Sequence, residues 1–361
     1  MKGVSERFVD LASQIGGFAQ DNLDSWIYLK SPLTLFHWTM NVIEVLLILG
    51  AVVGLRWAWT RWKAGQATFL CFWLASVVFM LAMEVPVYFP EKIGGDANDI
   101  LFLHNEFTIN FFFGRAPLYI MALYPALMFS SFVLMTELKV VRPGSKILLA
   151  GVVVGFAHHI FYEIFDHFGP QYGWWIWNHP QFLSHLGAVP VSSMLNFAFL
   201  GPVLLTWGVL RLLPLVEPKG GAVMPLPQVL IRSVFAGLWV PVATVLVSPA
   251  TWFAVLGVSM TAMSEVIVAS SILIGAALLT WLSLRAESRF VATQSKSAPV
   301  RYLWLFVLVF ALLWGVAVPD YLAAEDGVTA LGTATGSLSY AMACLCVAIG
   351  LLLRGPARRE E

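Results

Sequence analysis

Residues 157–180 read AHHIFYEIFDHFGPQYGWWIWNHP, an apolar helical run that also carries a dense set of titratable side chains. Five ionisable residues fall within ten positions: His158, His159, Glu163, Asp166 and His167. Ionisable groups at membrane depth are costly, and they usually face the interior of a helix bundle or a wet cavity. We therefore expect a membrane helix that turns most of these groups toward a protein interior.

The composition of the whole chain indicates an integral membrane protein. Of its 361 residues, 59% are hydrophobic and only 12% are charged, whereas soluble domains average about 25% charged residues. The 21 basic and 21 acidic residues balance, so nothing in the charge predicts a nucleic-acid partner. The three cysteines lie in apolar runs and indicate neither a disulfide framework nor a zinc site. The expected partner is the lipid bilayer.

Long apolar segments predict an all-α, polytopic transmembrane bundle, because a helix of about 20 residues crosses the hydrocarbon core. About nine spans are expected, at residues 33–56, 67–89, 115–137, 146–168, 186–212, 229–248, 264–285, 302–318 and 337–353. Basic residues cluster after every second span, and acids such as Glu91, Asp96 and Asp99 occupy the loop after the second. Basic loops stay in the cytoplasm. This pattern predicts an outside N-terminus and a cytoplasmic C-terminus in a multi-pass cell-membrane protein.

The chain divides into four segments by composition. Residues 1–30 predict an amphipathic surface helix, and residues 31–213 a five-helix membrane bundle that carries the polar site. Residues 214–228, rich in proline and glycine, predict a cytoplasmic linker. Residues 229–361 predict a four-helix membrane bundle that acts as a scaffold.

Polar residues at one end of the first bundle define the predicted site, which this topology places toward the outer leaflet. The candidate catalytic residues are carboxylates and one histidine: Glu163, Asp166, His159, Glu84 and Glu106. The candidate substrate-binding residues are His104, Asn105, Arg115, Trp174, Trp175, His37, Glu44 and Asn196. Two simpler interpretations stay open, because tryptophans also anchor helices at the membrane interface and buried carboxylates also form structural hydrogen-bond networks.

Helical geometry gathers the central residues on one face. At about 100° per residue, His159, Glu163 and Asp166 fall with His167 within one arc of about 100°, whereas His158 points elsewhere. A protonated acid beside an ionised base is the arrangement that proton transfer requires. The face therefore predicts acid/base chemistry in which His159 relays protons between carboxyl groups.

The same residues offer a metal as an alternative. His159, Glu163 and His167 follow one another at intervals of four residues, and His104 could complete a site for iron or zinc. The chain lacks the spaced HxxxH and HxxHH boxes of membrane di-iron hydroxylases and desaturases. We expect no cofactor, and a divalent metal remains the alternative.

The stretch YEIFDHFGPQYGWWIWN at residues 162–178 resembles two families of membrane proteins. These are the carotenoid-biosynthesis hydratases and the spirocyclase-type membrane proteins of polyketide pathways. The resemblance covers the second to fifth predicted helices and rests on a few short matches: Glu163, Gly169, Gly173, Trp175, Pro190, and the pair Glu84 and Pro86. It implies acid/base chemistry on apolar substrates without redox cofactors. The double histidine and His167 depart from the pattern, which leaves the reaction open.

Three functions follow from these features. The first is a membrane enzyme of the lyase or isomerase type, which hydrates, isomerises or cyclises a hydrophobic isoprenoid, lipid or polyketide, as in carotenoid biosynthesis. The second is a metal-dependent lipid oxidoreductase or hydrolase. The third is a proton-coupled transporter or an accessory membrane subunit, because membrane acids and histidines also carry protons in transporters.

Overall fold

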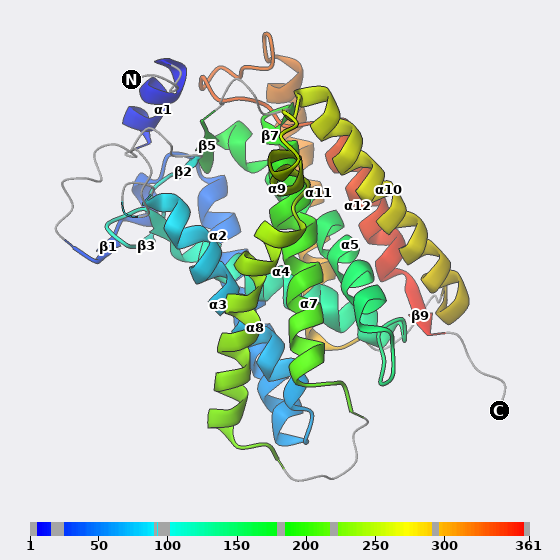
Figure 1. Ribbon diagram of the computed structural model, residues 1–361. Coiled ribbons are helices and arrows are strands. Elements are labelled where there is room, and N and C mark those ends of the chain that lie inside the picture. Colours follow the sequence, from blue (N-terminus) through cyan, green and yellow to red (C-terminus); the bar gives the residue numbers. More distant parts are fainter. Residues whose placement is uncertain are drawn as a thin grey trace.

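The structure is a computed structural model that describes residues 6–15, 25–89, 92, 102–178, 185–216, 223–290 and 296–356. The described chain is mostly a bundle of long helices, with short strands at the end that carries the N-terminal helix (Figure 1). The acidic residues Glu91, Asp96 and Asp99, and residues 217–222 of the predicted linker, lie outside the described residues.

The described part of the chain contains eight helices that are long and apolar enough to cross a membrane. They are α2 (Thr39–Lys63), α3 (Ala67–Tyr88), α4 (Leu118–Glu137), α5 (Ile147–Asp166), the continuous run of α6 (Val191–Ser193), η6 (Met194–Leu200) and α7 (Gly201–Leu212), α8 (Leu226–Val247), α10 (Ala262–Glu287) and α11 (Ala298–Leu322). A further apolar helix, α12 (Leu338–Leu352), has only 15 residues. The prediction of a bundle of long apolar helices is confirmed; among the described residues, eight helices are long and apolar enough to cross a membrane and one is shorter.

Two predicted helix starts are wrong for local reasons. The first span begins at Thr39 instead of residue 33, because Pro32–Thr34 form a 3₁₀ turn (η2) whose N-cap is Ser31. The fifth begins at Val191, because residues 185–190 form a hairpin of β6 (His185–Leu186) and β7 (Val189–Pro190). Gly187 turns that hairpin with a φ of 62°, a conformation that favours glycine.

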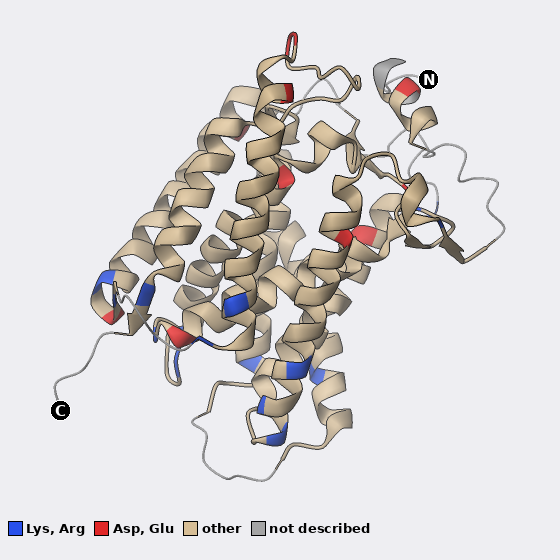
Figure 2. Ribbon diagram, turned by 180° about the vertical axis from the view of Figure 1, so that it is seen from behind, with Lys and Arg blue, Asp and Glu red and all other residues tan. Residues whose placement is uncertain are grey.

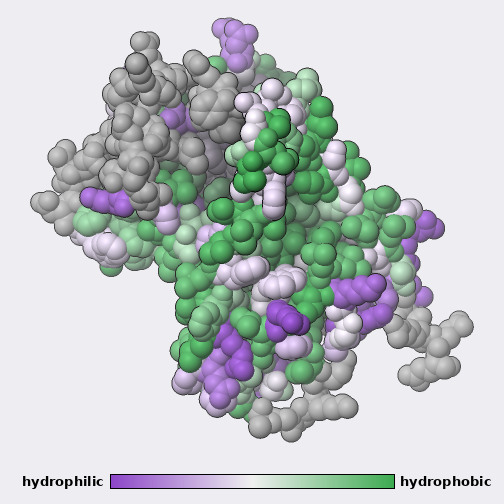
Figure 3. All heavy atoms as spheres, viewed as in Figure 1, coloured by the Kyte–Doolittle hydropathy of each residue, from purple (hydrophilic) through white to green (hydrophobic). Residues whose placement is uncertain are grey.

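Helix α4 is the centre of the bundle and α10 lies at its edge. In α4, 89% of the most apolar window is buried, whereas in α10 the share is 17%. Exposed apolar side chains cover α8 and α10, including Phe235, Leu238 and Ile274, and Figure 3 shows the apolar surface across the middle of the molecule. A helix that is apolar on its outer face suits a lipid environment.

The two halves of the chain pack into one core. Helix α8 packs on α3 and α7, α11 packs on α2 and α4, and α10 and α12 pack on α5. One continuous cluster of buried apolar residues joins Leu123 of α4 with Phe306 of α11 and Ala348 of α12. Helices on both sides of residues 214–228 therefore contribute to the same core.

Short strands fold the loops after α3 and α5 over one end of the bundle. Strand β2 (Phe102–His104) pairs antiparallel with β5 (Trp175–Trp177), and His104 lies opposite Trp175. Beside them, β3 (Ile109–Phe111) pairs with both β1 (Ile27–Leu29) and β4 (Ala116–Pro117). Helix α1 (Glu6–Gln14) buries Phe8 and Leu11 in a cluster with Leu103 and Ile176. The amphipathic pattern of this helix is thus explained by packing on the sheet.

The opposite end of the bundle carries most of the basic residues (Figure 2). There β8 (Ser288–Phe290), directly after α10, pairs with β9 (Arg354–Pro356), directly after α12. The short helix α9 (Pro249–Val255) follows α8 at the other end of that span. Charge therefore distinguishes the two ends of the molecule, as the sequence pattern predicts.

Candidate active site

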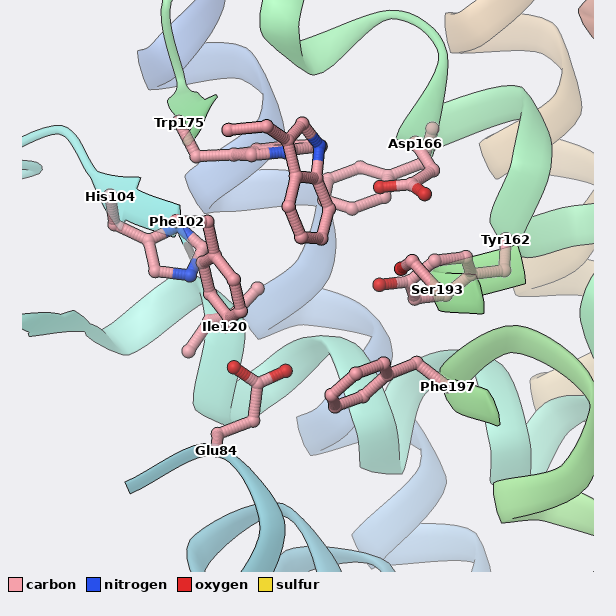
Figure 4. Close-up of a pocket in the computed structure, with 11 residues that line it drawn as sticks. Glu84, Phe102, His104, Ile120, Tyr162, Asp166, Trp175, Ser193 and Phe197 are labelled. Atoms are coloured by element: carbon pink, nitrogen blue, oxygen red, sulfur yellow. The ribbon is translucent and has the colours of Figure 1, made fainter. Parts of the chain in front are cut away.

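A narrow cavity of about 20 Å³ lies at the end of the bundle covered by the strands. Helices α3, α4 and α5 and the π-helical segment η6 contribute its walls, and strands β2 and β5 close it (Figure 4). Its lining combines polar groups with aromatic and apolar side chains: Glu84, His104, Tyr162, Asp166, Ser193, Phe102, Ile120, Phe165, Trp175, Trp177 and Phe197.

Glu84 is the polar group that α3 contributes, and two tyrosines hold it. The Tyr88 hydroxyl, one helical turn later, donates to Glu84 Oε2 at 2.7 Å. The Tyr124 hydroxyl, from α4, donates to Glu84 Oε1. Both carboxyl oxygens therefore accept a phenol hydrogen, and the side chain is 3% exposed. This is a fixed carboxyl group whose position is set by two neighbouring helices.

Asp166 faces the same cavity from the last residue of α5 (Figure 4). Its Oδ2 is buried and has no hydrogen-bond partner among the described residues. Tyr162, one turn earlier on α5, lines the cavity beside it. Glu84 is close enough to interact electrostatically with Asp166. An unpartnered oxygen in a buried site is free to bind a ligand group.

His104 completes the polar lining from strand β2. Its Nδ1 lies 2.9 Å from the Tyr119 hydroxyl of α4, whereas its buried Nε2 has no partner in the described part of the chain. Burial lowers the pKa of His104 to about 3, because the low-polarity surroundings disfavour the imidazolium ion. At neutral pH the cavity therefore contains an uncharged imidazole whose Nε2 is available for a hydrogen bond.

Trp175 forms an aromatic wall that depends on Gly169. A Cβ atom at Gly169 would lie 2.1 Å from the Trp175 ring, so only glycine lets the indole pack against this turn. Trp174 has a different role. It is fully buried and donates from Nε1 to the Thr39 hydroxyl at 2.9 Å, away from the cavity lining. Of these two predicted substrate-binding residues, the structure places only Trp175 at the cavity.

The wall opposite the strands is a π-helical turn. Segment η6 follows directly after Ser193 and contains Phe197, and both residues line the cavity. His158 on α5 donates from Nδ1 to the Ala198 carbonyl at 2.7 Å, which ties this segment to α5. Asn196 lies on η6 but is not among the lining residues. Such π-helical insertions occur frequently at functional sites.

The remaining charged face of α5 turns away from the cavity toward α12. His159 Nδ1 and His167 Nε2 lie 3.3 Å and 3.4 Å from the two carboxyl oxygens of Glu163. The other nitrogen of His159 is 2.8 Å from the Tyr340 hydroxyl. The Ser337 amide donates to His167 Nδ1 at 3.1 Å. Glu163 and His159, predicted as catalytic residues, therefore form a buried cluster that is separate from the cavity lining.

Four other predicted site residues hold loops in place. Glu106 forms an ion pair with Lys30 at 3.0 Å. Glu44 accepts hydrogen bonds from the backbone amides of Thr108 and Ile109, both at 3.3 Å. Asn105 donates to the Gly173 carbonyl at 2.8 Å, and Arg115 donates to the Tyr88 carbonyl at 2.6 Å. None of these four residues lines the cavity.

His37 also lies outside the cavity lining. Its ring stacks on Tyr172 with 4.4 Å between the centroids, and its Nδ1 is 2.8 Å from the Thr39 hydroxyl. Burial lowers the pKa of His37, and the nearby Asp320 carboxylate partly opposes this shift. The contacts of His37 join the start of α2 to the turn after α5.

The residues named for a metal do not come together in one group. His159 and His167 contact Glu163 on one side of α5, whereas His104 lies in the cavity. Among the described residues, no set of three or more His, Cys, Asp or Glu side chains is arranged to hold a metal ion.

Four tyrosines are among the residues that the sequence analysis did not name for the site. Tyr88 and Tyr162 stand four positions from Glu84 and Asp166 on the same helices, a spacing that places side chains on one face. That spacing was a signal in the sequence. Tyr119 and Tyr124, on α4, are recognisable only once α4 is known to be central.

Comparisons with protein-family models, with curated proteins and with solved structures find no match to this chain.

Proposed function

We propose that this protein is a membrane-embedded enzyme that transfers protons to and from a hydrophobic substrate, in a reaction of the isomerase or lyase type. The observation that carries the proposal is the meeting of Glu84 and Asp166 in one cavity with His104. Two carboxyl groups in unlike surroundings are the usual basis for dividing the roles of acid and base.

The hydrogen bonds assign the two roles. Two phenol donors stabilise a carboxylate at Glu84, which makes Glu84 the base. Asp166 has an oxygen without a donor, which suits a protonated carboxyl group that acts as the acid. Asp166 gives its proton to one carbon of a C=C bond, which leaves a positive charge on the other carbon. Glu84 then removes a proton from the next carbon beyond that cation, and exchange with water returns Asp166 to its protonated form and Glu84 to its carboxylate form. The double bond moves and the substrate keeps its composition.

The walls of the cavity fit an apolar substrate with little polar structure. Phe102, Phe165, Phe197 and Trp175 surround the carboxyl groups, and aromatic faces stabilise a positive charge that develops on carbon during protonation. The neutral His104 provides one hydrogen-bonding nitrogen, Nε2, for a hydroxyl or carbonyl group. This combination supports an isoprenoid, lipid or polyketide substrate.

The short resemblance to carotenoid hydratases and spirocyclase-type proteins agrees with this class of substrate. Its residues Glu84, Gly169 and Trp175 all contribute to the cavity or to the packing of its wall, whereas Glu163 does not line it. Hydration, isomerisation and cyclisation can all begin with the transfer of a proton to a double bond. The proposal therefore includes all three reactions.

We further propose that the protein spans the cell membrane with its N-terminus outside and its C-terminus in the cytoplasm. The basic end of the bundle supports this orientation (Figure 2), because Lys and Arg are retained on the cytoplasmic side. The cavity then lies toward the outer leaflet. The orientation can be tested with variants that carry a single cysteine, either at Ser25 or at Thr60, and a reagent that does not cross membranes. In intact cells the reagent should label the cysteine at position 25 and not the cysteine at position 60.

The experiment that tests the function is a comparison of lipid extracts. Cells that lack the protein should accumulate a hydrophobic precursor, and complementation with the wild-type gene should remove it. Complementation with Glu84→Gln or Asp166→Asn should leave the precursor in place while the protein is still found in the membrane. Normal clearance by both variants would refute the assignment.

A further inference from the structure

A second, larger hollow of about 700 Å³ lies at the basic end of the bundle, far along the helices from the candidate active site. The C-terminal ends of α2, α4 and α10, the turn between α4 and α5, and strand β9 contribute to its walls. Residues Trp57 and Phe69 give it an aromatic side. It is therefore a depression at the basic end of the bundle with both apolar and charged walls.

Within the described part of the chain, two cations that line this hollow have no acidic partner. Its lining contains three basic residues, Arg61, Lys139 and Arg142, and two acidic ones, Glu137 and Glu287. Arg142 pairs with Glu287 at 2.6 Å. Glu137 accepts from the Ser297 amide at 3.0 Å. Among the described residues, no carboxylate forms a salt bridge with Arg61 or Lys139.

Lys139 occupies a backbone position that favours glycine. It follows the C-cap of α4, Leu138, and its φ is 63°, the left-handed conformation in which helices usually end at glycine. Lys139 is exposed and lines the hollow at this turn.

Arg61 is held in place by its neighbours without losing its charge. Its guanidinium carbon lies 4.6 Å from the centre of the Trp57 ring, and its Nη1 is 3.4 Å from Gln66 Oε1. Both contacts orient the planar guanidinium, and neither supplies a negative charge. A guanidinium oriented in this way matches a phosphate group, to which it can donate two parallel hydrogen bonds.

We infer that the hollow binds the phosphate of an anionic phospholipid headgroup. Arg61 and Lys139 would contact the phosphate oxygens, and the aromatic side would contact the glycerol and the upper acyl chain. The position favours a lipid over a soluble phosphate ester, because Trp281 and Leu282 on the last turns of the adjoining α10 are exposed apolar residues. Basic pockets between helices on the cytoplasmic side recognise such headgroups. The inference does not depend on the chemistry of the other cavity.

The test measures lipid binding to the purified full-length protein in detergent, by native mass spectrometry with phosphatidylglycerol and phosphatidylcholine. The wild type should prefer phosphatidylglycerol. The double variant Arg61→Gln/Lys139→Gly should bind it about ten-fold more weakly, because two charge-assisted contacts are lost. Glycine relieves the strain at position 139 and offsets the loss of the Arg61 contacts with Trp57 and Gln66, so the lipid-free variant should unfold at a temperature close to that of the wild type.

A matched control comes from α10. Arg285 lies over Trp281 at 4.7 Å in the last turn of that helix, and it is not part of the lining, so Arg285→Gln should keep the preference. Equal binding of the two lipids by the wild type, or equal losses in the double variant and Arg285→Gln, would overturn the site. Displacement of the lipid by an equal concentration of glycerol 3-phosphate would assign the hollow to a soluble ester and overturn the lipid.

Discussion

Glu84 of α3 and Asp166 of α5 face one narrow cavity from two different helices, and each has a different set of hydrogen bonds (Figure 4). Tyr88 and Tyr124 both donate to Glu84, whereas Oδ2 of Asp166 has no partner among the described residues. This difference is the structural basis for a base and an acid in a single apolar site.

Replacement of Glu84 by glutamine should abolish turnover. The amide keeps the shape of the side chain but cannot accept a proton, and loss of a general base costs about 10²–10⁴-fold in rate. Glu106→Gln is the matched control, because Glu106 pairs with Lys30 outside the cavity lining. Clearance of the precursor by membranes that contain each variant measures the effect. Similar losses in the two variants would contradict the role of Glu84.

The two tyrosines that bind Glu84 should contribute to stability. Tyr124→Phe removes a hydroxyl that donates to a buried carboxyl group, which should lower the free energy of unfolding by about 1–3 kcal/mol. Tyr302→Phe is the control, since the buried Tyr302 hydroxyl has no partner among the described residues, and this change should be neutral or stabilising. Thermal unfolding in detergent measures both. A larger loss in Tyr302→Phe would count against this explanation.

Stability should depend on pH through His104. Its pKa is about 3 in the folded protein and about 6.5 in an unfolded chain. Between pH 3 and pH 6.5, His104 is therefore protonated in the unfolded chain but not in the folded protein. Because protons favour the unfolded chain, the stability of the folded protein decreases as the pH falls from about 6.5 toward 3. The slope in this window is about 1.4 kcal/mol per pH unit for one group.

The variant His104→Asn isolates this contribution, because the other titrating groups are shared with the wild type. Unfolding temperatures at pH 7 and pH 5 should differ less in the variant than in the wild type. An identical pH dependence in the two proteins would show that His104 is not a buried neutral group.

Gly169→Ala should disturb the aromatic wall of the cavity. The added Cβ would lie 2.1 Å from the Trp175 ring, so the indole must move and the rate of clearance should fall. Gly275→Ala is the matched control on α10, where no heavy atom lies within 4 Å of the new Cβ, and a helical glycine-to-alanine change is stabilising by about 0.5–1 kcal/mol. Normal activity in Gly169→Ala would mean that Trp175 does not shape the site.

The sequence predicted the class of the fold because apolar length and the placement of basic residues are local properties. It also named Glu84, Asp166, His104 and Trp175, all of which line one cavity. Helical spacing could not show which edge of the polar face on α5 points at that cavity. The answer depends on α12, whose Tyr340 contacts His159 and whose start contacts His167 through Ser337.

The residues that hold the loops were the least predictable part of the site. Glu44 of α2 accepts from the backbone amides of Thr108 and Ile109, and Glu106 pairs with Lys30. These pairs join segments that are distant in the sequence, and no local pattern records them. A charged residue in an apolar segment therefore indicates that its side chain has a partner. The sequence does not show whether that partner is another residue or a substrate.

The most direct test of proton transfer needs no knowledge of the substrate. Membranes that contain the wild-type protein are incubated in D₂O, and their lipids are analysed by mass spectrometry for deuterium bound to carbon. We predict that one hydrophobic compound gains deuterium with the wild type and not with Glu84→Gln or Asp166→Asn. Equal incorporation with the wild type and with both variants, or none with the wild type, would contradict acid/base catalysis at this cavity.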